Sequence, residues 1–232
     1  MNRKQIHAVV FDLDGTLLDT LRDLADAVNA ALTKNGLPTR SLDDVRRFVG
    51  NGIANLIVRA MPGGEYPDTL SDIADDPVKV ELHHRLLQDF SEYYEIHCED
   101  NTRPYDGIVP LLETLKAQGI RMAVVSNKAD FAVKKMIPSY FGDLIDVAAG
   151  EDEAHGIGKK PSPEMVLSAL GKIGVAPEHA IYVGDSDVDI RTAKNAGIPC
   201  ISVLWGFRSR EFLLEHGAVT LICEPEELLA YL

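Results

Sequence analysis

The chain has 232 residues, of which 46% are hydrophobic and 25% charged, and its formal net charge is −13. That length accommodates one large domain, or a core domain with a smaller companion, and the composition is typical of a globular protein. The excess of acidic residues argues against general nucleic-acid binding, which needs clustered Lys and Arg. No apolar run in the sequence reaches the roughly 18 residues of a membrane span, so we expect no membrane partner.

The cysteines and the N-terminus indicate the compartment. Cys98, Cys200 and Cys223 are far apart in the sequence, without the spacing of a zinc site or a disulfide framework. The N-terminal apolar run is short and stops at Asp12, which is unlike a signal peptide. We therefore expect a cytoplasmic protein in a reducing environment.

Short runs rich in Val, Ile and Ala alternate with helix-like segments along most of the chain. The runs are nearly continuous in apolar residues, which is typical of strands covered on both faces of a parallel sheet. We expect strands at 6–12, 120–127, 180–185 and 200–205, and weaker ones at 147–150 and 220–223. Helices are expected at 106–119, 162–174, 187–197 and 209–218. This alternation predicts an α/β fold with a Rossmann-like, doubly wound parallel sheet.

One long interval lacks any strand pattern. Between Leu17 and about residue 102 the segments 21–36, 41–50, 53–61 and 77–98 look helical. The first of these places its leucines and Val28 on one helical face, as an amphipathic helix does. We therefore predict a core domain of residues 1–16 and 103–232 and an inserted, all-helical domain of residues 17–102.

Polar residues follow three of the predicted strands. Asp12 and Asp14 come after the first, Ser126 and Asn127 end the second, and Asp185 ends the third. Ligands of open parallel sheets bind at the carboxyl ends of the strands, so these residues can share one crevice. Clustered carboxylates repel one another unless a cation lies among them, and ligation by oxygen alone favours Mg²⁺, which in turn favours a phosphate substrate. Taken singly, each aspartate can equally be a turn residue after a strand.

The segments "DLDGTLLDT", "VVSNK", "KKPSP" and "GDSDVDI" resemble, in order, the four motifs of haloacid dehalogenase-like phosphatases. The resemblance covers nearly the whole predicted core, and the helical insertion lies where the first type of cap of that superfamily belongs. Within the superfamily the chain is most similar to phosphoglycolate phosphatases. The resemblance implies Mg²⁺-dependent hydrolysis of a small organic phosphomonoester through an aspartyl-phosphate, by a monomer or homodimer whose partner is a small phosphorylated metabolite.

Other activities of the superfamily remain open as alternatives. A phosphomutase of the β-phosphoglucomutase type shares all four motifs and the cap position. An inorganic pyrophosphatase or a nucleotidase of the same superfamily is a further alternative. A dehalogenase needs neither Mg²⁺ nor the second aspartate, so Asp14 and Asp185 argue against it.

The resemblance also implies a role for each motif residue. Asp12 is expected to be the nucleophile and Asp14 the general acid and base. Lys160, directly before the first proline of K-P-x-P, is expected to neutralise the phosphoryl charge, with Lys159 peripheral. The implied Mg²⁺ ligands are the Asp12 carboxylate, the Asp14 main-chain carbonyl and Asp185.

The remaining motif residues are expected to support these groups. Gly15 and Ser126 are expected at the phosphate, and Asn127 at the phosphate or at the leaving group. Thr16 is expected to brace the turn after the first strand, and Asp189 to orient the metal's waters or Lys160. Asp187 reads as a solvated acid at a helix start. In the cap, arginine side chains are candidates for binding a substrate carboxylate, with no reason in the sequence to prefer one of Arg22, Arg46 and Arg47.

Overall fold

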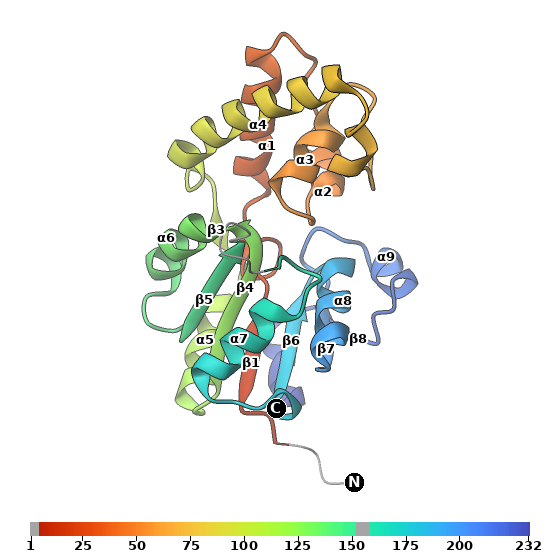
Figure 1. The fold of residues 1–232 in the computed structure, drawn as a ribbon. Helices are drawn as coiled ribbons and strands as arrows, with labels where there is room; N and C mark the ends of the chain where they lie inside the picture. Colours follow the sequence, from red (N-terminus) through yellow and green to blue (C-terminus); the bar gives the residue numbers. More distant parts are fainter. Residues whose placement is uncertain (1–4, 152–157) are drawn as a thin grey trace. The chain divides into compact units, whose positions relative to one another are not determined.

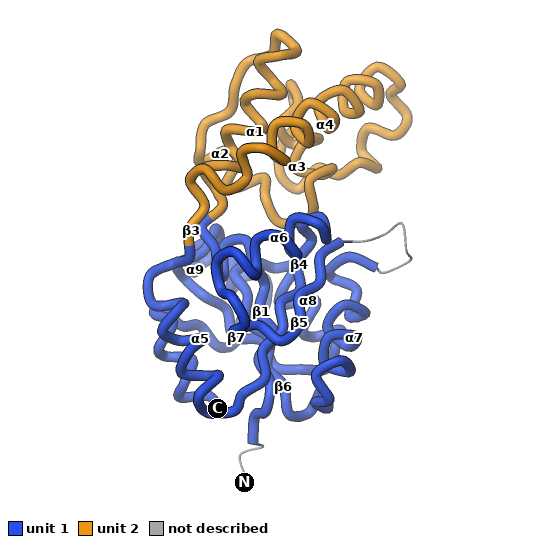
Figure 2. Tube along the Cα trace, turned by 90° about the vertical axis from the view of Figure 1, so that its left-hand side faces the viewer, with its two compact units in different colours: residues 1–19, 104–232 blue, residues 20–103 orange. Residues whose placement is uncertain are grey.

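The structure is a computed structural model that describes residues 5–151 and 158–232. It divides into two compact units, coloured separately in Figure 2. Unit 1 runs up to Asp19 and resumes at Pro104, and unit 2 comprises Thr20–Arg103. The chain passes from one unit to the other through β2 (Leu18–Asp19) and β3 (Arg103–Pro104), which form a two-stranded sheet.

Unit 1 is built on a parallel sheet, which confirms the predicted α/β class (Figure 1). Six strands in the described part of the unit pair in the order β5-β4-β1-β6-β7-β8. They are β1 (Ala8–Phe11), β4 (Arg121–Ala129), β5 (Val147–Glu151), β6 (Ala180–Gly184), β7 (Cys200–Val203) and β8 (Thr220–Ile222). The chain leaves β1 toward β4 on one side and later returns to β6 on its other side. Such a reversal of strand order is where doubly wound folds bind their ligands.

Helices cover both faces of this sheet. They are α5 (Ile108–Ala117), α6 (Asp130–Phe141), α7 (Glu164–Ile173), α8 (Asp187–Ala196) and α9 (Arg210–Glu215), with 3-10 helices η3 (Pro177–His179) and η4 (Pro225–Tyr231). Because side chains alternate along a strand, Val9 and Phe11 of β1 pack in one core cluster with α5 and α6. Ala8 and Val10 pack in a second cluster with α7 and α8. Burial on both faces explains why β1 is apolar throughout.

Two helices of unit 1, α6 and α7, differ from the sequence-based expectation. Helix α6 was not predicted, and it contains Pro138 in its last turn. Its residues Val133, Met136 and Ile137 are buried in the core cluster of the sheet, so tertiary packing outweighs the missing backbone donor of the proline. Helix α7 begins at Glu164, two residues after the start of the expected segment 162–174, and Pro163 is its N-cap.

Unit 2 is helical between its two linking strands. Its elements are α1 (Leu21–Lys34), α2 (Leu42–Phe48), α3 (Ile53–Ala60), η1 (Leu70–Ile73) and α4 (Pro77–His97). The apolar face predicted for the first helix is buried, with Leu24 5% and Val28 0% exposed. Helix α1 packs mainly against α4. Among the helices of the described residues, none has both the length and the apolar character that crossing a bilayer requires.

Candidate active site

Three neighbouring strands bring the motif residues to one edge of the sheet. Strand β1 pairs in parallel with β4 on one side and with β6 on the other, so that Phe11 lies opposite both Val124 and Val183. Asp12 therefore follows β1 beside the strand ends that carry Ser126 and Asp185. The backbone N–H of Asp12 continues the pairing by donating to the carbonyl of Val183 at 2.9 Å.

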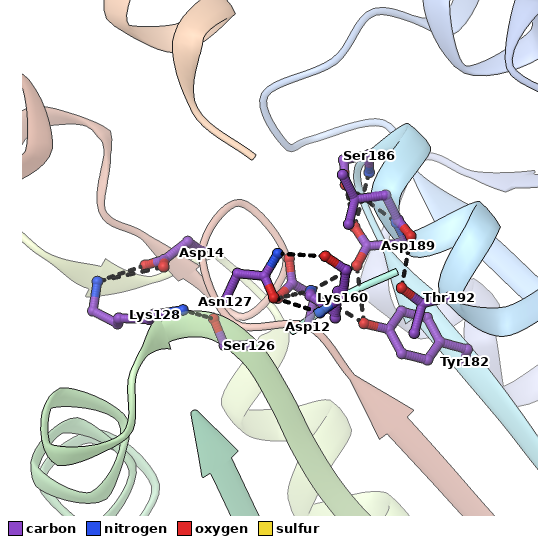
Figure 3. A network of polar contacts seen from close by, with 11 residues as sticks. Asp12, Asp14, Ser126, Asn127, Lys128, Lys160, Tyr182, Ser186, Asp189 and Thr192 are labelled. Carbon is purple, nitrogen blue, oxygen red and sulfur yellow. Dashed lines mark hydrogen bonds and ion pairs between the residues drawn. The ribbon is translucent and has the colours of Figure 1, made fainter. Parts of the chain in front are cut away.

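Lys160 lies at the centre of this edge, in contact with two carboxylates (Figure 3). Its Nζ lies 2.6 Å from Asp12 Oδ1, 2.8 Å from Asp189 Oδ1 and 3.2 Å from the hydroxyl oxygen of Tyr182. The Lys160 side chain is 3% exposed. Lys159, by contrast, is 35% exposed and lies 4.0 Å from Glu151. The fold thus brings Lys160, and not its neighbour, to Asp12.

Asn127 positions the backbone of Lys160. Its side-chain Nδ2 donates to the Lys160 carbonyl at 3.0 Å, and the Lys160 N–H donates to Asn127 Oδ1 at 2.7 Å. These two reciprocal hydrogen bonds join the end of β4 to the segment before α7. The Asn127 side-chain amide is therefore engaged with the Lys160 backbone.

Asp189 is held by the start of α8. Its Oδ2 accepts hydrogen bonds from the Ser186 hydroxyl at 2.6 Å and the Ser186 N–H at 3.0 Å, and Ser186 is the N-cap of the helix. Its Oδ1 accepts from Tyr182 at 2.9 Å as well as from Lys160. Asp189 is 0% exposed, so these donors provide the hydrogen bonds that a buried carboxylate requires.

Asp187 differs from the expectation of a solvated acid. It is 5% exposed, and its Oδ2 lies 2.6 Å from the guanidinium of Arg191, one turn further along α8. The sequence-based reading of Asp187 as solvated is therefore wrong. An ion pair between residues four apart on a helix explains how it is accommodated.

Two glycines make room for the Asp185 carboxylate. A Cβ atom at Gly15 would lie 2.4 Å from Asp185 Oδ2, and one at Gly206 would lie 2.4 Å from Asp185 Cβ. Gly15 also has φ +85, a conformation that favours glycine. The Asp185 Oδ2 atom accepts the N–H of Phe207 at 2.6 Å. Gly206 and Phe207 thus define the position of Asp185, a role for these two residues that the sequence analysis did not indicate.

Thr16 contacts the same loop through its backbone. The indole Nε1 of Trp205 donates to the Thr16 carbonyl at 3.0 Å. The Thr16 hydroxyl is buried and has no hydrogen-bond partner among the described residues. A hydrogen bond to the Thr16 carbonyl, and not one to the Thr16 side chain, therefore connects the turn after β1 to the loop after β7.

Two carboxylates of this site, Asp12 and Asp185, have raised pKa values. Burial, and then the charge of Asp189, raises the pKa of Asp12 well above its usual range, while Lys160 opposes the change. Burial and the charge of Asp189 likewise raise the pKa of Asp185 to about 7, against the hydrogen bond from Phe207. Burial alone lowers the pKa of Lys160, but Asp12 and Asp189 outweigh it and raise that pKa. One lysine thus leaves part of the acidic charge uncompensated.

The acidic cluster has the donor set of a Mg²⁺ site. Carboxylate oxygens of Asp12, Asp185 and Asp189 lie within 4.8 Å of one another, and all three residues are buried. Oxygen ligands alone suit a hard cation. Asp189 already accepts hydrogen bonds on both oxygens, so Asp12 and Asp185 are the carboxylates better suited to a metal.

Asp14 forms a separate ion pair. Its Oδ1 lies 3.0 Å and its Oδ2 3.4 Å from Nζ of Lys128, and the Lys128 side chain is 2% exposed. Figure 3 shows this pair apart from the group of Asp12, Lys160 and Asp189. The Lys128 N–H also donates to the Ser126 hydroxyl at 3.2 Å. Lys128 was not among the expected site residues, although it directly follows Asn127 in the motif "VVSNK".

The candidate arginines of unit 2 are each paired with a nearby acid on or next to their own helix. Arg22 pairs with Asp26 at 3.0 Å and Arg46 with Asp43 at 2.8 Å, and Arg47 contacts Asp44. The arginine side chains are between 43% and 69% exposed. These contacts therefore give no reason to prefer one of the three arginines as the candidate for binding a substrate carboxylate.

The chain matches the family model of haloacid dehalogenase-like hydrolases over residues 9–203. It belongs to this family. A phosphoglycolate phosphatase from Thiobacillus denitrificans is 34% identical over 203 residues, which cover 87% of this chain and 85% of that protein. An N-acetylmuramic acid 6-phosphate phosphatase from Pseudomonas aeruginosa is 32% identical over 231 residues, which cover 99% and 96%.

The fold is shared as well. A solved structure from Lactobacillus delbrueckii subsp. bulgaricus, provisionally named a phosphoglycolate phosphatase, matches with a TM-score of 0.87 at 35% identity, over 97% of each chain. The resemblance to the phosphoglycolate phosphatase group is thereby confirmed, and the chain is a hydrolase of the phosphatase type.

Proposed function

We propose that this protein is a Mg²⁺-dependent phosphatase that hydrolyses a small organic phosphomonoester through an aspartyl-phosphate on Asp12. The observation that carries the proposal is the contact of Lys160 Nζ with Asp12 Oδ1 at 2.6 Å, inside a buried acidic cluster. A buried carboxylate paired with an ammonium is held in one orientation, and the ammonium favours the anion that a nucleophile must be, against the burial that raises the pKa of Asp12.

In the first step an oxygen of Asp12 forms a bond to phosphorus, and the bond from phosphorus to the leaving oxygen breaks. Asp14 gives its proton to that oxygen, so that the leaving group departs as an alcohol. In the second step a water molecule attacks the phosphorus of the aspartyl-phosphate, and Asp14 takes the proton from the water. The products are the alcohol and inorganic phosphate, and Asp12 and Asp14 return to their initial states.

The phosphoryl oxygens need donors throughout both steps. We assign this role to the Ser126 hydroxyl, the backbone N–H of Asn127 and the ammonium of Lys160, with Gly15 allowing the loop to approach closely. Asp189 and Tyr182 keep Lys160 in place through the bonds at 2.8 and 3.2 Å. Lys160 therefore serves both the nucleophile and the transferred group.

Mg²⁺ would be held by the Asp12 carboxylate, the Asp14 main-chain carbonyl and Asp185. When bound, it supplies positive charge that offsets the repulsion between the attacking carboxylate and the phosphoryl oxygens. The raised pKa values of Asp12 and Asp185 support this assignment. They indicate that the positive charges of the protein alone do not balance the negative charge of the two carboxylates. Unit 2, inserted directly after β2, is assigned the role of the cap domain that selects the leaving group.

For the substrate we propose a small phosphoester of the phosphoglycolate type. Named phosphatases that are similar to this chain include ones for phosphoglycolate and for N-acetylmuramic acid 6-phosphate. Both of those compounds contain a carboxylate in addition to the phosphoester, which supports an acidic leaving group.

Hydrolysis of p-nitrophenyl phosphate by the purified full chain tests the proposal. We expect activity with Mg²⁺ that EDTA abolishes, and a loss of at least about 10³-fold in kcat for Asp12→Asn. Asp43→Asn, on an exposed side chain of α2, is the matched control and should retain activity. Borohydride reduction of enzyme quenched during turnover should convert an acyl phosphate at Asp12 to homoserine, detectable by peptide mass. Activity of Asp12→Asn within tenfold of the wild type would refute the assignment of Asp12 as the nucleophile.

A further inference from the structure

The indole of Trp205 connects two segments of unit 1 that are far apart in the sequence. Its Nε1–H donates to the Thr16 carbonyl at 3.0 Å, across 189 positions of the chain. The Trp205 ring lies in the loop after β7 and packs, partly buried, against the core cluster of the sheet. Thr16 is 0% exposed. Because the bond is shielded from water on the side of Thr16, it is a firm connection between the two segments.

Each of the two segments carries one part of the proposed Mg²⁺ site. The turn after β1 contains Asp14, whose main-chain carbonyl is a proposed ligand and lies two residues before Thr16. The loop after β7 contains Phe207, whose N–H donates to Asp185 Oδ2 at 2.6 Å. The bond from Trp205 therefore connects the segment that supplies one ligand to the segment that holds another.

Packing between the same two segments prevents them from moving closer. A Cβ atom at Gly206 would lie 2.4 Å from the Gly15 carbonyl oxygen, and one at Gly15 would lie 2.4 Å from Asp185 Oδ2. There is thus no space even for a methyl group between them. The hydrogen bond of Trp205 acts in the opposite direction, because it resists their separation. The distance between the segments is therefore limited from both sides.

We propose that Trp205 is a positioning residue that limits the size of the Mg²⁺ site and thereby favours Mg²⁺ over Ca²⁺. The proposal rests on the proposed phosphatase function and on its metal site. Mg²⁺ requires near-octahedral oxygen ligands at about 2.0–2.1 Å, whereas Ca²⁺ accepts more ligands, in flexible geometry, at about 2.3–2.6 Å. A site whose segments cannot separate suits the smaller ion. Without the indole N–H, the turn after β1 can move away from Asp185, and the site loses the geometry that Mg²⁺ needs.

The chain contains one tryptophan, at position 205, so a tryptophan analogue supplied during expression changes this position alone. In 3-benzothienylalanine a sulfur atom replaces the indole N–H, while the size of the ring system is nearly unchanged. 5-Fluorotryptophan keeps the N–H and is the matched control. Metal binding by the full chain is measured without substrate, from the EPR signal of free Mn²⁺ and the displacement of bound Mn²⁺ by Mg²⁺ or Ca²⁺.

The benzothienyl protein should bind Mg²⁺ about 10- to 100-fold more weakly than the wild type, as expected when a group that orients metal ligands is lost. Its dissociation constant for Ca²⁺ should rise by less than about threefold, because Ca²⁺ tolerates a wider site. The protein with 5-fluorotryptophan should bind both ions as the wild type does. A difference between the two ions is a readout that a general loss of stability would not produce.

An equal weakening of Mg²⁺ and Ca²⁺ binding in the benzothienyl protein would overturn the inference, because Trp205 would then support the site without limiting its size. Unchanged binding of both ions would overturn it as well, and neither result would affect the phosphatase function. Thermal melting checks folding, and Trp205→Phe, which also lacks the donor, replaces the analogue if that protein does not unfold cooperatively. A wild type that binds no Mn²⁺ or Mg²⁺, and that does not hydrolyse p-nitrophenyl phosphate, would instead refute the proposed function and the inference with it.

Discussion

Lys160 Nζ lies 2.6 Å from Asp12 Oδ1, and both side chains are almost completely buried. These residues are 148 positions apart in the sequence, and the contact forms because β1 and the segment before α7 end at the same edge of the sheet. Asp189 shares the ammonium at 2.8 Å. One cation between two buried acids fixes the direction of all three side chains, and it leaves net negative charge beside Asp185.

Replacing Lys160 should remove the positive charge that orients the Asp12 and Asp189 side chains. We expect Lys160→Met to lower kcat for p-nitrophenyl phosphate by about 10²- to 10⁴-fold, because a preorganised charge at the transferred group is lost. Lys159→Met is the matched control, since the Lys159 side chain is 35% exposed and 4.0 Å from Glu151. It should stay within about threefold of the wild type. Equal losses in the two variants would contradict the assignment of Lys160.

The space for Asp185 can be tested with glycine variants. Gly206→Ala would place a Cβ atom 2.4 Å from Asp185 Cβ, so the carboxylate must shift. We expect the Mg²⁺ concentration for half-maximal activity to rise at least about tenfold, as for disturbed metal ligands. Gly171→Ala in α7, where no atom lies within 4 Å of the added Cβ, should instead stabilise the protein by up to about 1 kcal/mol. An unchanged Mg²⁺ requirement in Gly206→Ala would count against Asp185 as a ligand.

Asp23 should be important for the stability of unit 2. Its buried carboxylate accepts hydrogen bonds from the backbone N–H groups of Asn101 and Thr102, both at 2.9 Å, and from the Thr102 hydroxyl at 2.7 Å. Asp23→Ala leaves these donors unpaired, and we expect a loss of about 3 kcal/mol in the free energy of unfolding, measured with urea. Asp26→Ala removes only an exposed i,i+4 pair with Arg22 and should cost less than about 0.5 kcal/mol. Similar losses would show that Asp23 has no special role.

His83 should make unit 2 less stable in acid. Its Nε2 lies 2.9 Å from the Ala54 carbonyl, and its Nδ1 is buried with no hydrogen-bond partner among the described residues. Burial, with the nearby His84, lowers the pKa of His83 below its value in the unfolded chain. The unfolded chain then binds the proton more readily, so the histidine's contribution to stability is complete above about pH 6.5 and is lost as the pH falls below it.

Urea unfolding at about pH 7.5 and pH 5 measures this effect. His83→Gln should lose less stability between the two values than the wild type does, because glutamine does not titrate. His84→Gln changes an exposed residue and leaves the burial of His83, the largest cause of its lowered pKa, in place. It should therefore lose nearly as much stability on acidification as the wild type. If His83→Gln and the wild type lose equal stability on acidification, the protonation of His83 is not responsible.

Much of the fold was predictable because it depends on local patterns. Continuous apolar runs identified the strands of unit 1, and the spacing of Leu21, Leu24, Val28 and Leu32 identified the buried face of α1. Helix α6 was missed, because its sequence contains Pro138 and its stability comes from packing against the sheet. Asp187 was misread as solvated. The predicted helix 187–197 already placed Arg191 one turn after it, but the burial of Asp187 depends on the folded structure.

By itself, the sequence determined the order of the four motifs, the strand ends that carry them and the family to which they point. These features depend on residue type and on spacing along the chain. Only the tertiary structure decided that Lys160 contacts Asp12, that Asn127 fastens the Lys160 backbone, that Gly15 and Gly206 make room for Asp185, and that Lys128 holds Asp14. Each of these relationships joins residues far apart in sequence, or side chains whose directions are set by burial. The pairing of buried charges is decided by the neighbours that folding brings within hydrogen-bond distance.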